Sequence, residues 1–271
     1  MSGNIVRMGS AHPVVMASWR LFFACAVMAL FSGGRLKEIF NLGRKDTLKV
    51  FLTGMVLAAH LIAWIAAVQH TKIANAVVFF CINPVITSIA AHYFYGEKIT
   101  RGLTVSVFLG FAGIGLMGYD DLHMSFENAI GDAWALICSL LFTVYFLFGK
   151  DLRKRLGTTT YVVAIYGAAA ITSFTVMFIM GLPAFSYDKS TWACFALLAI
   201  VPTAIGHTSF NAALKYIDAS KISALTLTEP AMAGAVAWLV WGESLDSFDI
   251  AGYCFVSLSV LVLLWWKGKK D

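Results

Sequence analysis

Long hydrophobic stretches separated by short polar segments make up most of this sequence. Each stretch is close to the roughly 20 apolar residues that a helix needs to cross a lipid bilayer. The stretches are continuously apolar, and they are longer than the roughly 10-residue alternating segments of a membrane-spanning strand. The pattern therefore predicts nine membrane-spanning helices, near residues 13–32, 48–70, 74–95, 102–119, 130–149, 159–181, 192–214, 221–241 and 248–266.

The composition supports the same fold class, an all-α integral membrane protein. Of the 271 residues, 59% are hydrophobic and 13% are charged, whereas soluble domains are about 45–50% apolar and about 25% charged. These values exclude a disordered chain, a disulfide-stabilised secreted module and a nucleic-acid-binding protein. The five cysteines lie far apart and belong to no Cys/His cluster, so we predict no metal site and no cofactor.

The distribution of lysine and arginine predicts the orientation in the membrane. Cytoplasmic loops are enriched in these residues, and one side of the predicted bundle carries sixteen of them against three on the other. The C-terminus falls on the basic side and is therefore predicted to be cytoplasmic. The sixteen are Arg35, Lys37, Arg44, Lys45, Lys49, Lys98, Arg101, Lys150, Arg153, Lys154, Arg155, Lys215, Lys221, Lys267, Lys269 and Lys270, and the three are Arg7, Lys72 and Lys189.

The chain also contains an internal repeat with an offset of 146 residues. Pro84 then aligns with Pro230, and the pair Gly96-Glu97 aligns with Gly242-Glu243. The first Gly-Glu pair is predicted on the cytoplasmic side and the second on the opposite side, so the two halves are inverted. Inverted repeats are typical of transporters that bind their substrate near the middle of the membrane. We predict one repeat in residues 1–122 and the other in residues 130–267.

The same offset predicts that one helix is missing. The helix near 130–149 opens the second repeat, and its counterpart would span positions −16 to 3, before and at the start of this sequence. Nine helices are thus visible where a complete pair of repeats would have ten. Two explanations stay open: roughly 15–20 residues precede this chain in the complete protein, or the protein works with nine helices.

Several short motifs resemble the EamA-type family of drug/metabolite transporters. These are Trp19-Arg20, Thr71 to Ala76 before Asn83-Pro84, Gly96-Glu97, Gly131 to Leu136, Glu229-Pro230 and Gly242-Glu243. The resemblance covers essentially the whole chain and implies a bacterial inner-membrane permease with two five-helix inverted repeats. It implies transport of small metabolites or drugs, often outward, without naming the cargo. The chain departs from the family in lacking the first helix, which belongs to the family's substrate-path bundle.

Two candidate binding residues come directly before prolines inside predicted helices. Glu229 precedes Pro230, and its repeat mate Asn83 precedes Pro84. A proline removes a backbone donor and frees carbonyl groups, so both prolines are predicted helix breaks. Glu229 could bind a proton or a cationic substrate group, because apolar surroundings favour the protonated carboxyl. Asn83 could bind substrate through its amide. The structural alternative is that both side chains only hold helices together.

Five further side chains are predicted inside the membrane, where polar groups are costly and need a reason. His60 and His207 are near-mates in the repeat and could face each other across a central cavity; a histidine can titrate near neutral pH. Arg20 could bind a substrate carboxylate, pair with Glu229 or extend towards the lipid headgroups. The remaining two are Trp64, which aligns with Phe210, and the neighbouring Asn211. Each could instead be ordinary packing between helices.

Two glutamates are predicted to form gates. Glu97 and Glu243 close their helices at opposite membrane faces. A carboxylate at a helix C-terminus is unfavourable with the helix dipole, so a basic partner is expected, with Lys98 or Arg101 nearest to Glu97. A solvated helix end is the alternative.

The most consistent hypothesis is a secondary transporter that works by alternating access, driven by a proton gradient or by the gradient of the substrate. Its partners would be the lipid bilayer, a small-molecule substrate, the proton and a second copy. Gly110, Gly113 and Gly115 form a small-residue face that either packs within the monomer, which is the favoured interpretation, or forms a homodimer contact. An intramembrane enzyme is a weaker hypothesis, because the sequence contains neither HExxH nor GxSxG. A truncated, non-transporting membrane protein is the remaining alternative.

Overall fold

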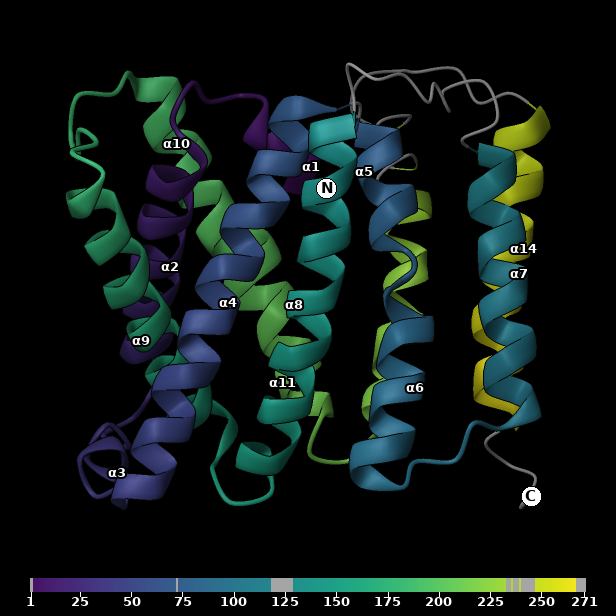
Figure 1. Ribbon diagram of the computed structural model, residues 1–271, viewed down its shortest axis with the longest axis horizontal. Coiled ribbons are helices and arrows are strands. Elements are labelled where there is room, and N and C mark those ends of the chain that lie inside the picture. Colours follow the sequence, from purple (N-terminus) through teal and green to yellow (C-terminus); the bar gives the residue numbers. More distant parts are fainter. Residues whose placement is uncertain are drawn as a thin grey trace.

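The computed structural model describes residues 2–71, 73–117, 129–232, 235, 239 and 247–266. Within these residues the regular structure is entirely helical (Figure 1). The helices are α1 (Ser2–Val6), α2 (Pro13–Leu30), α3 (Lys37–Phe40), α4 (Arg44–His70), α5 (Ile73–Phe80), α6 (Asn83–Tyr95), α7 (Arg101–Met117), α8 (Ala129–Arg153), α9 (Thr158–Ile179), α10 (Lys189–Leu198), the π-helix η2 (Ala199–His207), α11 (Thr208–Ala213), α12 (Ala219–Leu225), the 3₁₀ turn η3 (Thr226–Thr228) and α14 (Ser247–Trp266).

The chain is an all-α membrane protein. Among the described residues, six helical segments are long and apolar enough to cross a bilayer, and Arg101–Met117 and Ile250–Trp266 are shorter apolar helices. These eight segments coincide with eight of the nine predicted spans. The ninth, near 221–241, is described only in part and begins as α12.

The span near 74–95 is two helices rather than one. The helix stops after Phe80 and restarts at Asn83, because Pro84 has no N–H to continue the hydrogen-bond ladder. The backbone oxygen of Phe80 instead accepts a hydrogen bond from Ser139 Oγ at 3.4 Å. Gly96 then ends α6 in a left-handed conformation, with a φ of 65°.

Two pairs of repeat mates lie side by side. α2 packs along α9, and α7 packs along α14; each pair is related by the 146-residue offset. In Figure 1 the members of each pair run in opposite directions, since α7 rises from the end of α6 while α14 descends towards the C-terminus. This antiparallel packing is the arrangement that inverted repeats produce.

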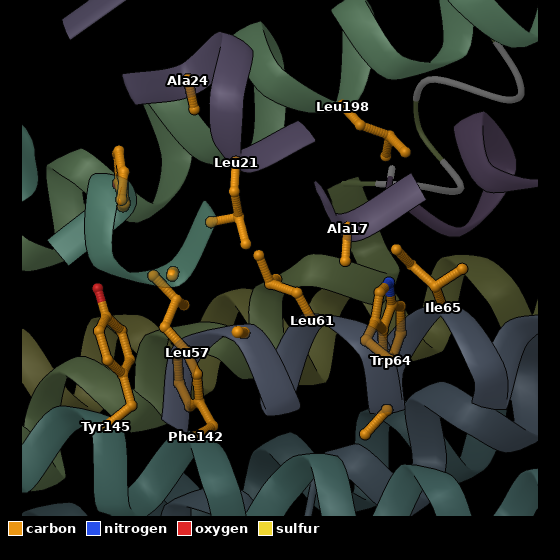
Figure 2. Packing of buried hydrophobic residues seen from close by; sticks show 14 of the residues in the cluster. Ala17, Leu21, Ala24, Leu57, Leu61, Trp64, Ile65, Phe142, Tyr145 and Leu198 are labelled. Atoms are coloured by element: carbon orange, nitrogen blue, oxygen red, sulfur yellow. The ribbon is translucent and has the colours of Figure 1, made fainter. Parts of the chain in front are cut away.

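The main core lies between α2, α4, α8, α9 and α10. Apolar side chains of α2, α4 and α8 interdigitate at its centre (Figure 2). The fully buried members shown there include Ala17, Leu21, Leu57, Leu61 and Ile65. This packed core holds α2, α4 and α8 against the cavity described below.

The small-residue face of α7 is used inside the chain. A Cβ on Gly113 would lie 2.7 Å from the backbone oxygen of Gly252 in α14, and one on Gly110 would lie 2.5 Å from a methyl group of Leu227. Both glycines are therefore covered by the same chain. The favoured expectation of packing within the chain is therefore confirmed at these two positions, whereas Gly115 has open space beside it.

Candidate functional site

A cavity of about 260 Å³ lies between α2, α4, α8, η2, α11 and the segment that follows η3. Its walls are mostly aliphatic and aromatic, with a few polar groups among them. The lining residues are Ser2, Arg20, His60, Leu61, Trp64, Phe80, Phe142, Val201, Pro202, Ile205, Gly206, His207, Phe210, Glu229 and Met232. Five of the predicted binding residues, drawn from both predicted repeats, therefore share one cavity.

Arg20 is buried in the cavity wall, with 1% of its surface exposed. Its Nε donates a 2.7 Å hydrogen bond to Thr203 Oγ1 of η2. Thr203 in turn donates to the backbone oxygen of Leu198 at 2.8 Å. The side chain is thus anchored across the interior, and its extension towards the headgroups is excluded. No ion pair joins it to Glu229 in the described part of the chain.

The two histidines lie against each other. The rings of His60 and His207 are 5.9 Å apart between centroids and nearly perpendicular. Nδ1 of His60 lies 3.0 Å from the backbone oxygen of Cys138, so this nitrogen carries the hydrogen. The ring of Phe142 lies 5.0 Å from that of His60 and 6.0 Å from that of His207. The predicted juxtaposition across the repeats is thus present, with an aromatic ring beside it.

Trp64 and Phe210 both line the cavity, as their alignment in the repeat suggested. Trp64 is 7% exposed, and its ring lies 5.6 Å from that of Phe80 between centroids. Figure 2 shows its indole beside Ala17 and Ile65, at the edge of the main core. Its Nε1 has no hydrogen-bond partner. The indole therefore presents an unused donor in a mainly apolar surrounding.

Asn83 and Asn211 are placed elsewhere. Neither lines the cavity, and both are fully buried between helices. Nδ2 of Asn83 donates to the backbone oxygen of Ser139 at 3.0 Å and to Thr143 Oγ1 at 3.1 Å. Oδ1 of Asn211 accepts a 2.8 Å hydrogen bond from the Tyr145 hydroxyl. These contacts favour the structural alternative for both side chains.

The π-helix η2 is the feature that the sequence reasoning missed. It contains Pro202 and supplies Val201, Pro202, Ile205, Gly206 and His207 to the cavity wall. A π-helical turn is rare and interrupts the ordinary ladder, commonly at functional sites. Pro202 and Gly206 in the middle of an apolar span were the available signal, because both weaken a regular helix.

A cluster of charged side chains closes the end of the bundle that carries the basic loops. Glu97 pairs with Lys150 of α8, not with the predicted Lys98 or Arg101. The same carboxylate accepts hydrogen bonds from the backbone nitrogens of Ala219 and Ser220, at 3.0 and 3.1 Å. It thereby caps the start of α12, where the helix dipole favours a negative charge. Glu243, the other predicted gate, lies outside the described residues.

Asp218 extends this cluster towards solvent. It lies 2.8 Å from Lys221 and 3.6 Å from Lys150. Burial raises the pKa of its carboxyl, but the two lysines outweigh that effect and hold the pKa below its ordinary value. The cluster borders a second hollow of about 450 Å³ that Lys98, Lys154 and Trp266 also line. We refer to Glu97, Lys150, Asp218 and Ser220 as the basic-end gate, a name taken from the predicted role of Glu97.

The model of the EamA-like transporter family matches the chain over two segments, residues 4–119 and 129–265. The chain belongs to this family. An EamA-like transporter is a multi-pass membrane protein of a transport family rather than an enzyme in the usual sense.

No group of three or more His, Cys, Asp or Glu side chains within the described ranges is placed to hold a metal ion.

Relatives of this EamA-like chain carry similarly general names. An uncharacterized transporter of Archaeoglobus fulgidus is 27% identical over 203 residues, which are 74% of this chain and 70% of that protein. The uncharacterized transporter YyaM of Bacillus subtilis is 23% identical over 93% of this chain and 85% of its own length. One solved crystal structure superposes on this chain with a TM-score of 0.81 at 16% sequence identity. The superposition covers 97% of this chain and 91% of the other.

Proposed function

We propose that this protein is a secondary transporter that moves a small metabolite or drug across the bacterial inner membrane by alternating access. The observation that carries the proposal is the central cavity, because Arg20 and His60 of one repeat and His207 and Glu229 of the other line it together. A cavity between two inverted repeats can open to one side or the other as one repeat rocks against its mate. The proposed repeats are residues 1–122 and 130–267.

The basic-end gate supports a state that is closed on one side. Glu97 and Lys150 are mostly buried, with side-chain exposures of 4% and 13%, and they join α6 and α8 to the start of α12. Breaking such a cluster would separate these helix ends and open a path between the basic loops and the cavity. We propose that this end faces the cytoplasm, in accordance with the sixteen basic residues assigned to that side.

Proton coupling is proposed for Glu229. Its carboxyl lines the cavity directly before Pro230, and the charged or titratable side chains that share the cavity with it are Arg20, His60 and His207. Binding or loss of a proton at this carboxyl changes the cavity's charge by one unit, which is the change a proton-driven transporter needs.

The test is flux into liposomes that contain the purified protein. A panel of labelled small carboxylates, amines and neutral metabolites is offered with and without an imposed proton gradient. We expect the intact chain to transport at least one class above empty liposomes, and Glu229→Gln to transport without responding to the gradient. Phe22→Ala, an aromatic change on the exposed side of α2, serves as the control.

Two results would contradict the proposal. If no compound crosses faster than through empty liposomes, the alternative of a non-transporting membrane protein is favoured. If Glu229→Gln keeps its full response to the proton gradient, proton coupling at this carboxyl is wrong although transport stands.

A further inference from the structure

Three buried polar atoms around the cavity have no hydrogen-bond partner. They are Nη1 of Arg20, Nε1 of Trp64 and Nδ1 of His207, and all three residues line the same cavity. The first two nitrogens can only donate, while the third donates or accepts according to its tautomer. Leaving such groups buried and unpaired is unfavourable. Donors gathered in this way indicate a ligand that supplies acceptor oxygens.

The charge of Arg20 narrows the chemistry of that ligand. A guanidinium stays protonated in proteins, and this one is 1% exposed and forms no direct ion pair in the described part of the chain. The carboxyl of Glu229 lines the same cavity and interacts with the guanidinium electrostatically, without contacting it. A buried charge without a directly hydrogen-bonded counter-ion is unfavourable. Its Nε is held by Thr203, which orients the forked end, and the buried Nη1 has no partner among the described residues. Carboxylates match that fork in shape and charge.

The rest of the cavity fits a flat apolar body. The rings of Phe80, Phe142 and Trp64 form a continuous wall. The distance between ring centroids is 5.5 Å for Phe80 and Phe142 and 5.6 Å for Trp64 and Phe80. Aromatic pairs of this kind accept another ring edge-on or offset. The cavity volume of about 260 Å³ is just below the roughly 300–1,000 Å³ of typical ligand pockets. A small organic solute therefore suits it.

From these observations we infer that the cavity binds a small organic carboxylate with a flat, apolar body. The carboxylate lies on Arg20, with the indole N–H of Trp64 as a further donor, and the ring of the ligand lies against Phe80 and Phe142. The inference rests on the proposed transport function only where the ligand is also the cargo. Binding itself is a property of the cavity and can be measured without transport.

The test is calorimetric binding to the full chain in detergent, with three compounds of nearly equal shape: phenylacetate, neutral phenylacetamide and cationic 2-phenylethylammonium. We expect phenylacetate to bind about tenfold or more tightly than the amide, since a charge-assisted contact to a buried guanidinium is the difference between them. The cation should bind least. Equal binding of acid and amide, or tightest binding of the cation at Glu229, would overturn the inference.

Variants distinguish a specific loss of ligand binding at the cavity from a general loss of folding. Arg20→Gln should remove the preference for the acid over the amide, and Trp64→Phe, which keeps an aromatic ring, should weaken acid binding more than amide binding, because an N–H donates more strongly to a carboxylate than to a neutral amide oxygen. Arg155→Gln is the matched control, because this arginine pairs with Asp46 at the basic end, outside the cavity. If Arg20→Gln does not fold, Arg20→Lys and Trp64→Phe carry the test. Variants that all keep the acid preference contradict the inference.

Failure of the inference and failure of the transport proposal give different results. Acid binding without flux of any compound leaves the binding site in place and removes the transport function. Flux of amines or neutral solutes without acid binding leaves the transport function in place and removes the carboxylate site.

Discussion

At the scale of single residues, side chains of similar type serve different purposes according to their surroundings. Arg20 and Arg153 are both buried arginines with 1% exposure. Arg153 donates to the backbone oxygens of Asn211 and Leu156 and to Thr158 Oγ1. Its guanidinium therefore holds the connection between α8 and α9 in place. Arg20 makes one such contact, and its buried Nη1 has no hydrogen-bond partner. The number of satisfied donors thus distinguishes the structural Arg153 from Arg20, the proposed binding residue.

Asn83 permits a prediction at this scale. Its amide joins α6 to α8 through Ser139 and Thr143, so Asn83→Leu should lower the free energy of unfolding by about 1–2 kcal/mol, as buried interhelical hydrogen bonds in membrane proteins do. Substrate preference should not change, because the side chain is outside the cavity. Unfolding in detergent and the flux panel measure the two effects, with Thr104→Val on an exposed face of α7 as the control. An altered preference at unchanged stability would restore the binding hypothesis for Asn83.

At the scale of elements, helices that break determine where the site lies. α5 and α6 separate at the turn before Asn83-Pro84, and η2 departs from α-helical geometry around Pro202. Both interruptions free backbone groups and redirect the side chains that follow. The unbroken α2 and α9 pack closely along their length and form the rigid part. The interrupted segments thus contribute Phe80 and the residues of η2 to the cavity wall, and the regular helices α2, α4 and α8 supply the facing wall.

Packing between α7 and α14 gives a prediction with an internal control. In Gly113→Ala the new methyl group meets the backbone of Gly252 and Val256, and overpacking of this kind costs about 1–3 kcal/mol. In Gly115→Ala the methyl group enters open space, so the gain in helix propensity, about 1 kcal/mol at most, should dominate. Thermal unfolding of the two variants in the same detergent measures the difference. Equal stabilities would show that α7 and α14 do not pack this closely.

At the scale of the whole molecule, the charged groups lie mainly at the two ends and the cavity lies between them. The basic-end gate is the place where three helices meet: the end of α6, the end of α8 and the start of α12. Because this cluster connects parts of both proposed repeats, its state reports whether that end is open or closed. In the proposed alternating-access cycle, an open state would require Glu97 to release Lys150 and the start of α12.

We therefore predict that Glu97→Gln opens the basic end. In a background without the five cysteines, Ser223→Cys places a thiol at a fully buried position behind the gate. Its reaction with a membrane-impermeant thiol reagent should be about tenfold or more faster after Glu97→Gln, since loss of one partner of a buried charge pair costs about 3–5 kcal/mol. Asp46→Asn breaks the exposed pair with Arg155 at the same end and should leave the rate unchanged. Equal rates in all three proteins would show that Glu97 does not hold this end closed.

The sequence alone was sufficient for the helical membrane fold, the approximate spans and the family. The length of a hydrophobic segment and the position of lysines and arginines are local properties of the sequence. The bilayer acts on them directly, so they can be recognised without knowing any contact between helices. The 146-residue offset also suggested that His60 and His207 could face each other across a central cavity, because symmetry relates positions across the chain.

Only the tertiary structure decided which polar side chains share the cavity. Asn83 and Glu229 occupy equivalent places in the repeat. The amide of Asn83 nevertheless donates its hydrogen bonds to α8, while Glu229 lines the cavity. The partner of Glu97 is likewise a lysine 53 positions away in the sequence rather than a neighbour. Whether a polar group is satisfied depends on the side chains that other helices bring to it, and the sequence around that group does not contain this information.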